Sequence, residues 1–148
     1  RQMCIRDRLY SNNYINIFIN SKYLYWKSHN TKCTIEEIEQ LIEVSTTILD
    51  KLYEEKKMIG LIWDMRSTQT LTTKQVSRIT KFISGRTEKN DAITIASLVI
   101  IENPIIRNLF NIGLKICPPK SRPVIVTHTF DKAVEIIEYH RNLLSETT

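Results

Sequence analysis

The feature that most constrains the fold is an alternation, along the chain, of short apolar runs with longer segments of helical periodicity. Apolar runs of strand length cover 14–19, 22–28, 59–65, 94–101 and 123–127. Apolar residues recur at helical spacing over 35–57, 73–84, 102–116 and 129–144. The predicted order is therefore β-β-α-β-α-β-α-β-α. Because strands that alternate with helices pair in parallel, we expect one α/β domain with a mostly parallel sheet after an N-terminal β-hairpin.

Local signals support several of the helix boundaries. Thr34 and Glu37 have the spacing of a capping box, and so do Thr72 and Gln75. Asn103, followed directly by a proline, is typical of an N-cap with proline at the first helical position. These residues predict helices that begin after positions 34, 72 and 103.

The first eight residues, RQMCIRDR, do not resemble part of a folded domain. They show no periodicity, no helix cap and no initiator methionine at position 1. Read back through the genetic code, residues 2–8 fit the transposon end that is ligated to DNA fragments during library preparation. We interpret 1–8 as an artefactual leader and 9–148 as the domain, so the natural protein could extend upstream of Leu9.

Charge and cysteine content exclude several classes of protein. Removing residues 1–8 takes away three arginines and one aspartate, which lowers the net charge from +5 to +3. That value is too small to indicate a nucleic-acid partner. No apolar run is long enough to span a bilayer. Cys33 and Cys117, which remain, lack metal-ligand or redox spacing and predict free thiols in a reducing, cytoplasmic compartment.

The sequence also gives no sign of a bound cofactor or metal. Its three glycines are far apart, so no glycine-rich loop could approach a nucleotide phosphate. Its three histidines are scattered and have no partner at ligand spacing. We therefore predict neither cofactor nor metal.

Polar residues gather where the predicted parallel strands end. In open parallel sheets the ligand crevice lies at the carboxyl ends of the strands. The candidate ligand or partner crevice consists of Asp64, Arg66, Ser67, Asn103 and His128. One alternative is a small hydrolase or transferase in which Asp64 and His128 activate Ser67, although no nucleophile-elbow motif accompanies them.

Two further patterns concern binding surfaces. Lys74, Arg78 and Lys81 form a basic stripe at helical spacing, opposite the apolar side of that helix. Such a stripe is either a solvated face or a docking site for an acidic partner or anionic lipid headgroups. The segment 22–27, KYLYWK, interleaves aromatic residues with lysines, as nucleic-acid binders do, but strand propensity and core packing explain it equally well.

Two segments resemble the STAS or SpoIIAA-like family of small α/β regulatory domains. One is LIWDMRSTQTLTTKQV (61–76), an apolar strand that ends in Asp, then a loop and a helix start. The other is SRPVIVTHTFDKAVEII (121–137), similar to the last strand and helix of the family. In element order the resemblance extends over 14–144. It implies a SpoIIAA-like fold and a role in binding a protein partner.

The resemblance also implies a candidate phosphorylation site. In phosphorylated members of the family, a serine after an aspartate at the second helix start accepts a phosphate that switches partner binding. Those positions fall on Thr72 and Thr73, whereas Lys74 and Gln75 replace the small residues typical of the family. Thr73 could accept a phosphate at a helix N-terminus, while capping alone explains both threonines.

Together these observations predict a non-enzymatic regulatory or protein-interaction module of STAS-like type. It would bind its partner through the second helix and the loops at the strand ends. A lipid-binding domain is a second alternative, because the related CRAL-TRIO architecture also alternates strands and helices. An apolar cavity large enough for an acyl chain would favour that alternative.

Overall fold

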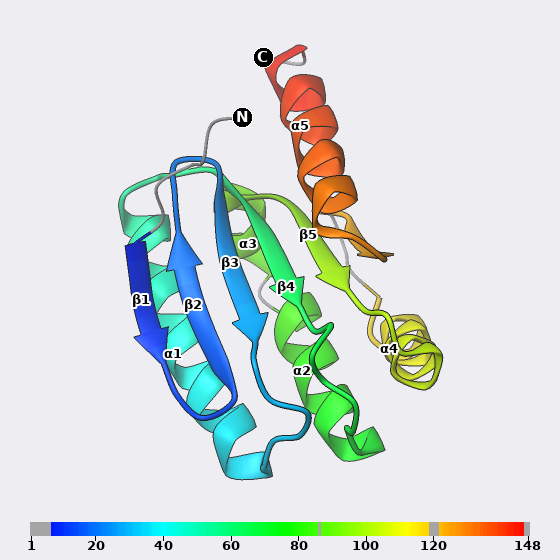
Figure 1. Ribbon diagram of the computed structural model, residues 1–148. Coiled ribbons are helices and arrows are strands. Elements are labelled where there is room, and N and C mark those ends of the chain that lie inside the picture. The colour runs from blue at the N-terminus through cyan, green and yellow to red at the C-terminus, as the bar shows by residue number, and fades with distance from the viewer. Residues whose placement is uncertain (1–6, 86, 119–121, 147–148) are drawn as a thin grey trace.

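The α/β class is confirmed, and every predicted strand and helix is present. The computed structural model describes residues 7–85, 87–118 and 122–146. Its elements are β1 (Asp7–Ser11), β2 (Ile15–Ile19), β3 (Tyr23–Ser28), α1 (Ile35–Glu54), β4 (Ile59–Asp64), α2 (Thr73–Gly85), α3 (Thr87–Ile93), β5 (Thr94–Ile100), α4 (Pro104–Ile116), β6 (Val124–Thr127) and α5 (Phe130–Glu146). Figure 1 shows their arrangement. None of the helices within those described ranges is long and apolar enough to cross a membrane.

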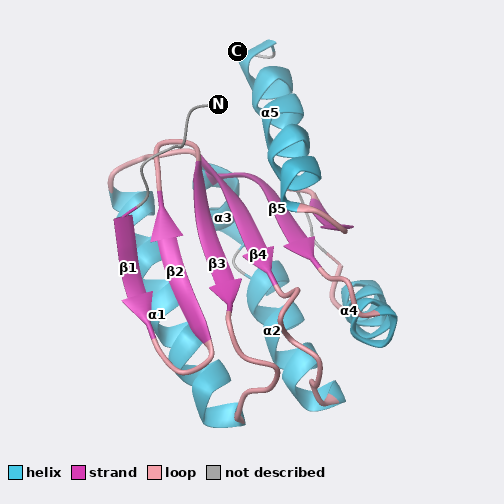
Figure 2. Ribbon diagram, in the orientation of Figure 1, coloured by secondary structure: helices cyan, strands magenta, loops and turns pink. Residues whose placement is uncertain are grey.

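The strands form one sheet in the order β1-β2-β3-β4-β5-β6. β1 and β2 are antiparallel, as are β2 and β3, whereas β3 to β6 pair in parallel. The sheet is therefore mixed, with two antiparallel pairings followed by three parallel ones, and Figure 2 shows the strand directions. The β2–β3 hairpin agrees with the prediction, and β1 adds the second antiparallel pairing.

Two elements were not predicted, β1 and α3. β1 includes Asp7 and Arg8, which we had assigned to the leader, and pairs them with Ile19 and Phe18 of β2. Its side chains are mainly exposed, so it lacks an apolar alternation that the sequence could reveal. α3 is a short polar helix without an apolar stripe. Neither β1 nor α3 has an apolar periodicity of its own, so each forms through its contacts with neighbouring elements.

Helices cover both faces of the sheet, but unequally (Figure 1). Parallel strands that follow one another in order through right-handed crossovers place their connecting helices on one face. The larger core accordingly joins the sheet to buried residues of α1, α2 and α4. α5 follows the last strand and packs on the opposite face with a smaller core.

The larger core is centred on two stacked indoles. Trp26 of β3 and Trp63 of β4 are direct neighbours in the parallel register, and their ring centroids are 3.7 Å apart. The Trp26 indole N–H donates to the Ser45 hydroxyl of α1 over 2.8 Å. This contact fixes α1 against the centre of the sheet.

Two glycines allow helices to approach closely. A Cβ at Gly60 of β4 would lie 2.6 Å from Cδ1 of Ile137, so the glycine lets α5 rest on the strand. A Cβ at Gly113 of α4 would lie 2.9 Å from Cγ2 of Thr80 in α2. The small residue therefore sets how α4 crosses α2.

The predicted helix starts are confirmed by hydrogen bonds. At α1, Thr34 accepts from the Glu37 backbone N–H at 3.1 Å, and Glu37 accepts in return from the Thr34 N–H at 2.8 Å. Thr72 and Gln75 make the same reciprocal pair before α2, over 3.1 and 2.9 Å. The α1 helix ends before the predicted position 57.

Candidate functional site

The end of β4 carries an ion pair between the buried carboxylate of Asp64 and the half-buried guanidinium of Arg66. Asp64 is 2% exposed. Its Oδ2 accepts from the Tyr25 hydroxyl and from Arg66 Nη2, each over 2.7 Å, and its Oδ1 accepts from Arg66 Nε over 2.9 Å. Burial raises the pKa of Asp64, but the hydrogen bonds and charge of Arg66 and the Tyr25 hydrogen bond outweigh it, so the net pKa lies below its usual value. Asp64 is therefore charged, and it has a structural role because it holds Tyr25 and Arg66 together.

The other candidate residues of the crevice are dispersed. The Asn103 side chain accepts from the Ile105 and Ile106 N–H groups over 2.9 and 3.3 Å, so it caps α4. His128 Nδ1 lies 3.3 Å from Arg107 Nη1 of α4. Asp64 instead bonds to Tyr25, which belongs to the core on the α5 face. Within the residues that the structure describes, Asp64 shares no hydrogen bond with Asn103 or His128.

A hydrolase would need its nucleophile, base and carboxylate within hydrogen-bond reach of one another. Within the described residues, no hydrogen bond joins Asp64, Ser67 and His128, and Ser67 is exposed in the loop after β4. Asp64, Ser67 and His128 therefore do not form a catalytic triad in this structure.

Thr72 and Thr73 have different environments at the start of α2. Thr72 uses its hydroxyl to cap the helix. Thr73 is exposed as the first residue of α2, and it lines a small pocket against α4. Of the two predicted phosphate acceptors, only Thr73 could be phosphorylated without loss of the capping hydrogen bond, because the Thr72 hydroxyl makes that bond.

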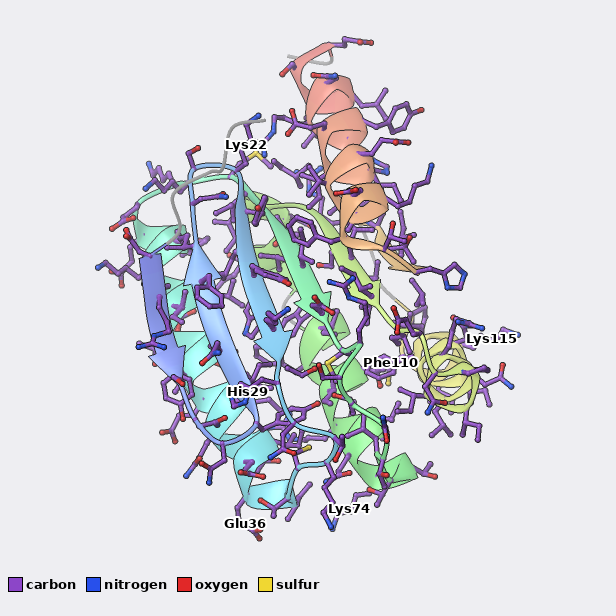
Figure 3. All side chains as sticks on the ribbon, viewed as in Figure 1. Lys22, His29, Glu36, Lys74, Phe110 and Lys115 are labelled. Carbon is purple, nitrogen blue, oxygen red and sulfur yellow. The ribbon has the colours of Figure 1, made fainter. Side chains whose placement is uncertain are left out.

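The predicted basic stripe lies along α2, beside α1. Arg78 donates to both carboxylate oxygens of Glu39 in α1, over 2.8 and 3.1 Å. Lys74 and Lys81 are exposed on the same helix. Figure 3 shows Lys74 near the first turn of α2. The stripe therefore contains one neutralised arginine and two lysines open to solvent.

The aromatic residues of the segment 22–27 are buried. Tyr23 is 6% exposed, Tyr25 3% and Trp26 0%. Tyr25 also contacts Phe130 of α5, with ring centroids 5.1 Å apart. Core packing explains these aromatic residues, and it leaves no free ring face on which a base could stack.

Cys33 is a half-buried thiol next to Tyr14. Burial raises the pKa of the Cys33 thiol to about 11, although a hydrogen bond from Tyr14 lowers it in part. Burial likewise raises the pKa of Tyr14, whose hydroxyl lies 2.7 Å from that of Thr68. A thiol with so high a pKa stays protonated at neutral pH and is a poor nucleophile.

The sequence analysis missed an apolar surface on α4. Ile105 is 73% exposed, Ile112 53% and Ile116 73%, and Leu109 is half-buried between them. These four residues follow one another at intervals of four, three and four, so they lie on one side of the helix. We call them the α4 stripe. The other apolar side of the helix is buried through Ile106 and Phe110.

The missed signal lies in the distribution of apolar residues along 104–116. A helix that covers a sheet needs one apolar face, with polar residues elsewhere. Here apolar residues extend round more of the helix than one face can bury: Ile105, Ile106, Leu109, Phe110, Ile112, Leu114 and Ile116. An excess of this kind could have indicated a second contact surface.

The α4 stripe borders a small pocket against α2. Its walls are Thr73, Val76, Ser77, Thr80, Leu109, Ile112, Gly113, Ile116 and Cys117. The pocket holds about 60 Å³, well below the volumes of about 300 to 1,000 Å³ usual for small-molecule sites. It is too small for an acyl chain. The surface is better suited to side chains of a macromolecule.

Comparisons with protein-family models, with curated proteins and with solved structures found no match to this chain. In the ranges that the structure describes, no three His, Cys, Asp or Glu side chains are grouped so as to hold a metal ion. We take the α4 stripe, with the wall of α2 beside it, as the candidate functional site, because it is an exposed apolar surface next to a pocket.

Proposed function

We propose that the chain is a non-enzymatic interaction module of STAS-like type that binds a protein through the α4 stripe. The observation that carries the proposal is the exposure of Ile105, Ile112 and Ile116 on one side of a well-formed helix. A contiguous apolar patch on a folded surface is a mark of an interaction site.

Energetics favour a partner at this place. Fully burying one isoleucine side chain contributes about 1.5 to 3 kcal/mol. Ile105 and Ile116 are mainly exposed and Ile112 is about half exposed, so a partner that covers them would gain a part of this contribution at each position. Ile105, Ile112 and Ile116 are not needed to attach α4 to the sheet. Ile106 and Phe110, on the other side of the helix, pack in the larger core instead. A partner that covers the stripe would use this apolar surface.

Two further observations favour a STAS-like module. The strand and helix order that carries the family resemblance occurs in the same sequence here, with β1 and α3 as additions. The polar residues at the strand ends have structural roles, as a non-enzymatic module would need: Asp64 forms an ion pair with Arg66, and Asn103 caps α4. The proposed partner surface includes α2, as the resemblance implies, and extends it to α4.

The test is a selection of helix-length random peptides on the full chain. We expect peptides that bind the wild-type protein but not the double variant Ile112→Ser, Ile116→Ser. Leu143→Ser is the matched control, because it removes an exposed leucine from α5 and should retain peptide binding. If no selected peptide distinguishes the double variant from the control, the α4 stripe is not an interaction surface and the proposal fails.

We infer that phosphorylation of Thr73 would modulate this binding. Thr73 is exposed and lies in the wall of the same pocket as Ile112. A negative charge placed there would change the potential beside the stripe. Binding of the selected peptides to Thr73→Asp and to the uncharged Thr73→Val separates the effect of charge from that of side-chain shape. Equal binding to both variants would contradict the phosphate switch alone.

A further inference from the structure

The α4 stripe has the same spacing when it is read in either direction. Its residues, Ile105, Leu109, Ile112 and Ile116, are separated by intervals of four, three and four. This is the spacing of the apolar seam by which two helices pair. When a second copy of α4 lies alongside in the opposite direction, Ile105 faces Ile116 of that copy and Leu109 faces Ile112. The stripe is therefore complementary in its spacing to a second copy of itself.

The charged residues at the two ends of the stripe have opposite signs. Glu102 is exposed directly before the N-cap of α4. Lys115 is exposed at the other end, and Figure 3 shows it on the outer side of the helix. In the antiparallel arrangement Lys115 lies level with Ile106 of the second copy, about one helical turn from Glu102 of that copy. A lysine side chain spans this distance, so each end of the pair gains one contact between opposite charges.

The same charges determine the direction of pairing. A parallel pair would place Lys115 against Lys115 and Glu102 against Glu102, and like charges in contact oppose association. In the antiparallel pair the two Lys115 residues are nine positions apart, about 14 Å along the helix axis, which exceeds the Debye length of about 8 Å. Arg107, the other charged residue of α4, lies beside His128 and not on the stripe. Charge therefore favours the antiparallel pair.

The position of α4 lets a second copy reach the stripe. The helix lies at the periphery of the molecule, where it packs on α2 (Figure 1). The small pocket at the edge of the stripe is lined by Thr73 and Ser77 of α2 and by Ile116. Since Ile105 of the second copy lies level with Ile116, its side chain can enter this pocket. A two-fold axis would produce the same contact twice.

We propose that the α4 stripe binds α4 of a second copy of this chain, in an antiparallel pair with a two-fold axis between Leu109 and Ile112. This inference rests on the proposed function, since it names the partner of the same surface. One helix pair with its pocket walls is smaller than the interface of a permanent dimer. We therefore expect a dimer in equilibrium with the monomer, with a micromolar or weaker dissociation constant.

Sedimentation velocity of the full chain over a wide range of concentration, up to the submillimolar, measures this equilibrium. We expect the sedimentation coefficient of the wild type to rise from that of a monomer to that of a dimer as the concentration increases. The double variant Ile112→Ser, Ile116→Ser should remain monomeric. Leu143→Ser removes an exposed leucine from α5 and should dimerise like the wild type.

Exchange of the end charges tests the antiparallel arrangement without changing the stripe. Glu102→Lys and Lys115→Glu should each raise the dimer dissociation constant about fivefold at low salt, because each places like charges at both contacts. An equimolar mixture of the two variants should dimerise as well as the wild type, since every contact between the two chains regains opposite charges. If the mixture dimerised no better than either variant alone, the antiparallel second copy would be wrong.

The outcomes separate this inference from the proposed function. If the wild type stays monomeric at every concentration, or if Ile112→Ser, Ile116→Ser still dimerises, the second copy is not the partner. The proposed function then stands as long as selected peptides bind in a stripe-dependent manner, and it fails if none do. Sedimentation of a monomeric wild type, but not of the isoleucine variant, with phosphatidylserine vesicles would assign this face to a membrane and overturn the proposal.

Discussion

At the scale of single residues, Asp64 shows how a buried carboxylate can stay charged, because hydrogen bonds and a nearby positive charge offset the cost of its burial. Its carboxylate is surrounded by donors from Tyr25 and Arg66, so burial does not neutralise it. A carboxylate whose folded-state pKa is lowered stabilises the fold above its usual pKa of about 4, and this contribution is lost as the pH falls through the folded pKa.

Asp64→Asn should therefore lower the free energy of unfolding at neutral pH by about 2 kcal/mol, the scale of hydrogen bonds to a charged group. The difference from wild type should stay constant from neutral pH to about pH 5 and shrink below about pH 4. Urea unfolding at a series of pH values measures both. Asp131→Asn, at an exposed carboxylate, is the control and should change stability by less than about 1 kcal/mol. A difference between wild type and Asp64→Asn that is the same at all pH values would contradict the role of the carboxylate charge.

At the scale of secondary-structure elements, the end of α1 contains a strained residue. Lys56 has a φ of 55°, in the left-handed region that favours glycine. It occupies the position after the C-cap, where its N–H donates to the Tyr53 carbonyl over 3.1 Å and the Lys57 N–H donates to the Leu52 carbonyl over 3.1 Å. Helices commonly place glycine at this position.

Lys56→Gly should raise the free energy of unfolding by about 1 kcal/mol, because it removes the steric cost of the left-handed conformation. Lys57→Gly is the matched control. That residue does not have a positive φ, so glycine there should destabilise the fold by about 0.5 to 1 kcal/mol through greater freedom of the unfolded chain. Thermal or urea unfolding of both variants tests the prediction, and effects of the same sign would show that the left-handed conformation is not the cause.

At the scale of the whole molecule, burial decreases from the centre of the sheet to its β1 edge. All residues of β4 and β5 are buried, whereas β1 is mainly exposed and pairs on one side only. Opening β5 would disrupt both cores, because Leu98 belongs to one and Val99 to the other. Opening β1 would cost few buried contacts.

Amide hydrogen exchange should follow this gradient. We expect the amides of β4 and β5 to exchange last, near the rate set by global unfolding, and those of β1 to exchange first among the strands. Exchange followed by mass spectrometry or NMR measures the order. If β1 exchanged as slowly as β5, the edge strand would be part of the same cooperative unit as the centre.

The sequence by itself determined the α/β class, the ranges of most elements and the helix starts, because these depend on local periodicity and on caps such as Thr34 that bond within one turn. It could not reveal β1 or α3, which have no apolar pattern of their own. It also placed the candidate site at the strand ends, where Asp64 instead forms an internal ion pair.

Only the tertiary structure decided which residues of α4 remain at the surface. The sequence shows that this helix has more apolar residues than one face can bury, but not which of them meet the sheet. That choice depends on how α4 crosses α2, and the contact of Gly113 with Thr80 sets the crossing. Ile106 and Phe110 are thereby turned inward, and Ile112 is left exposed beside α2. Local periodicity fixes the faces of a helix, whereas contacts distant in sequence decide which face is covered.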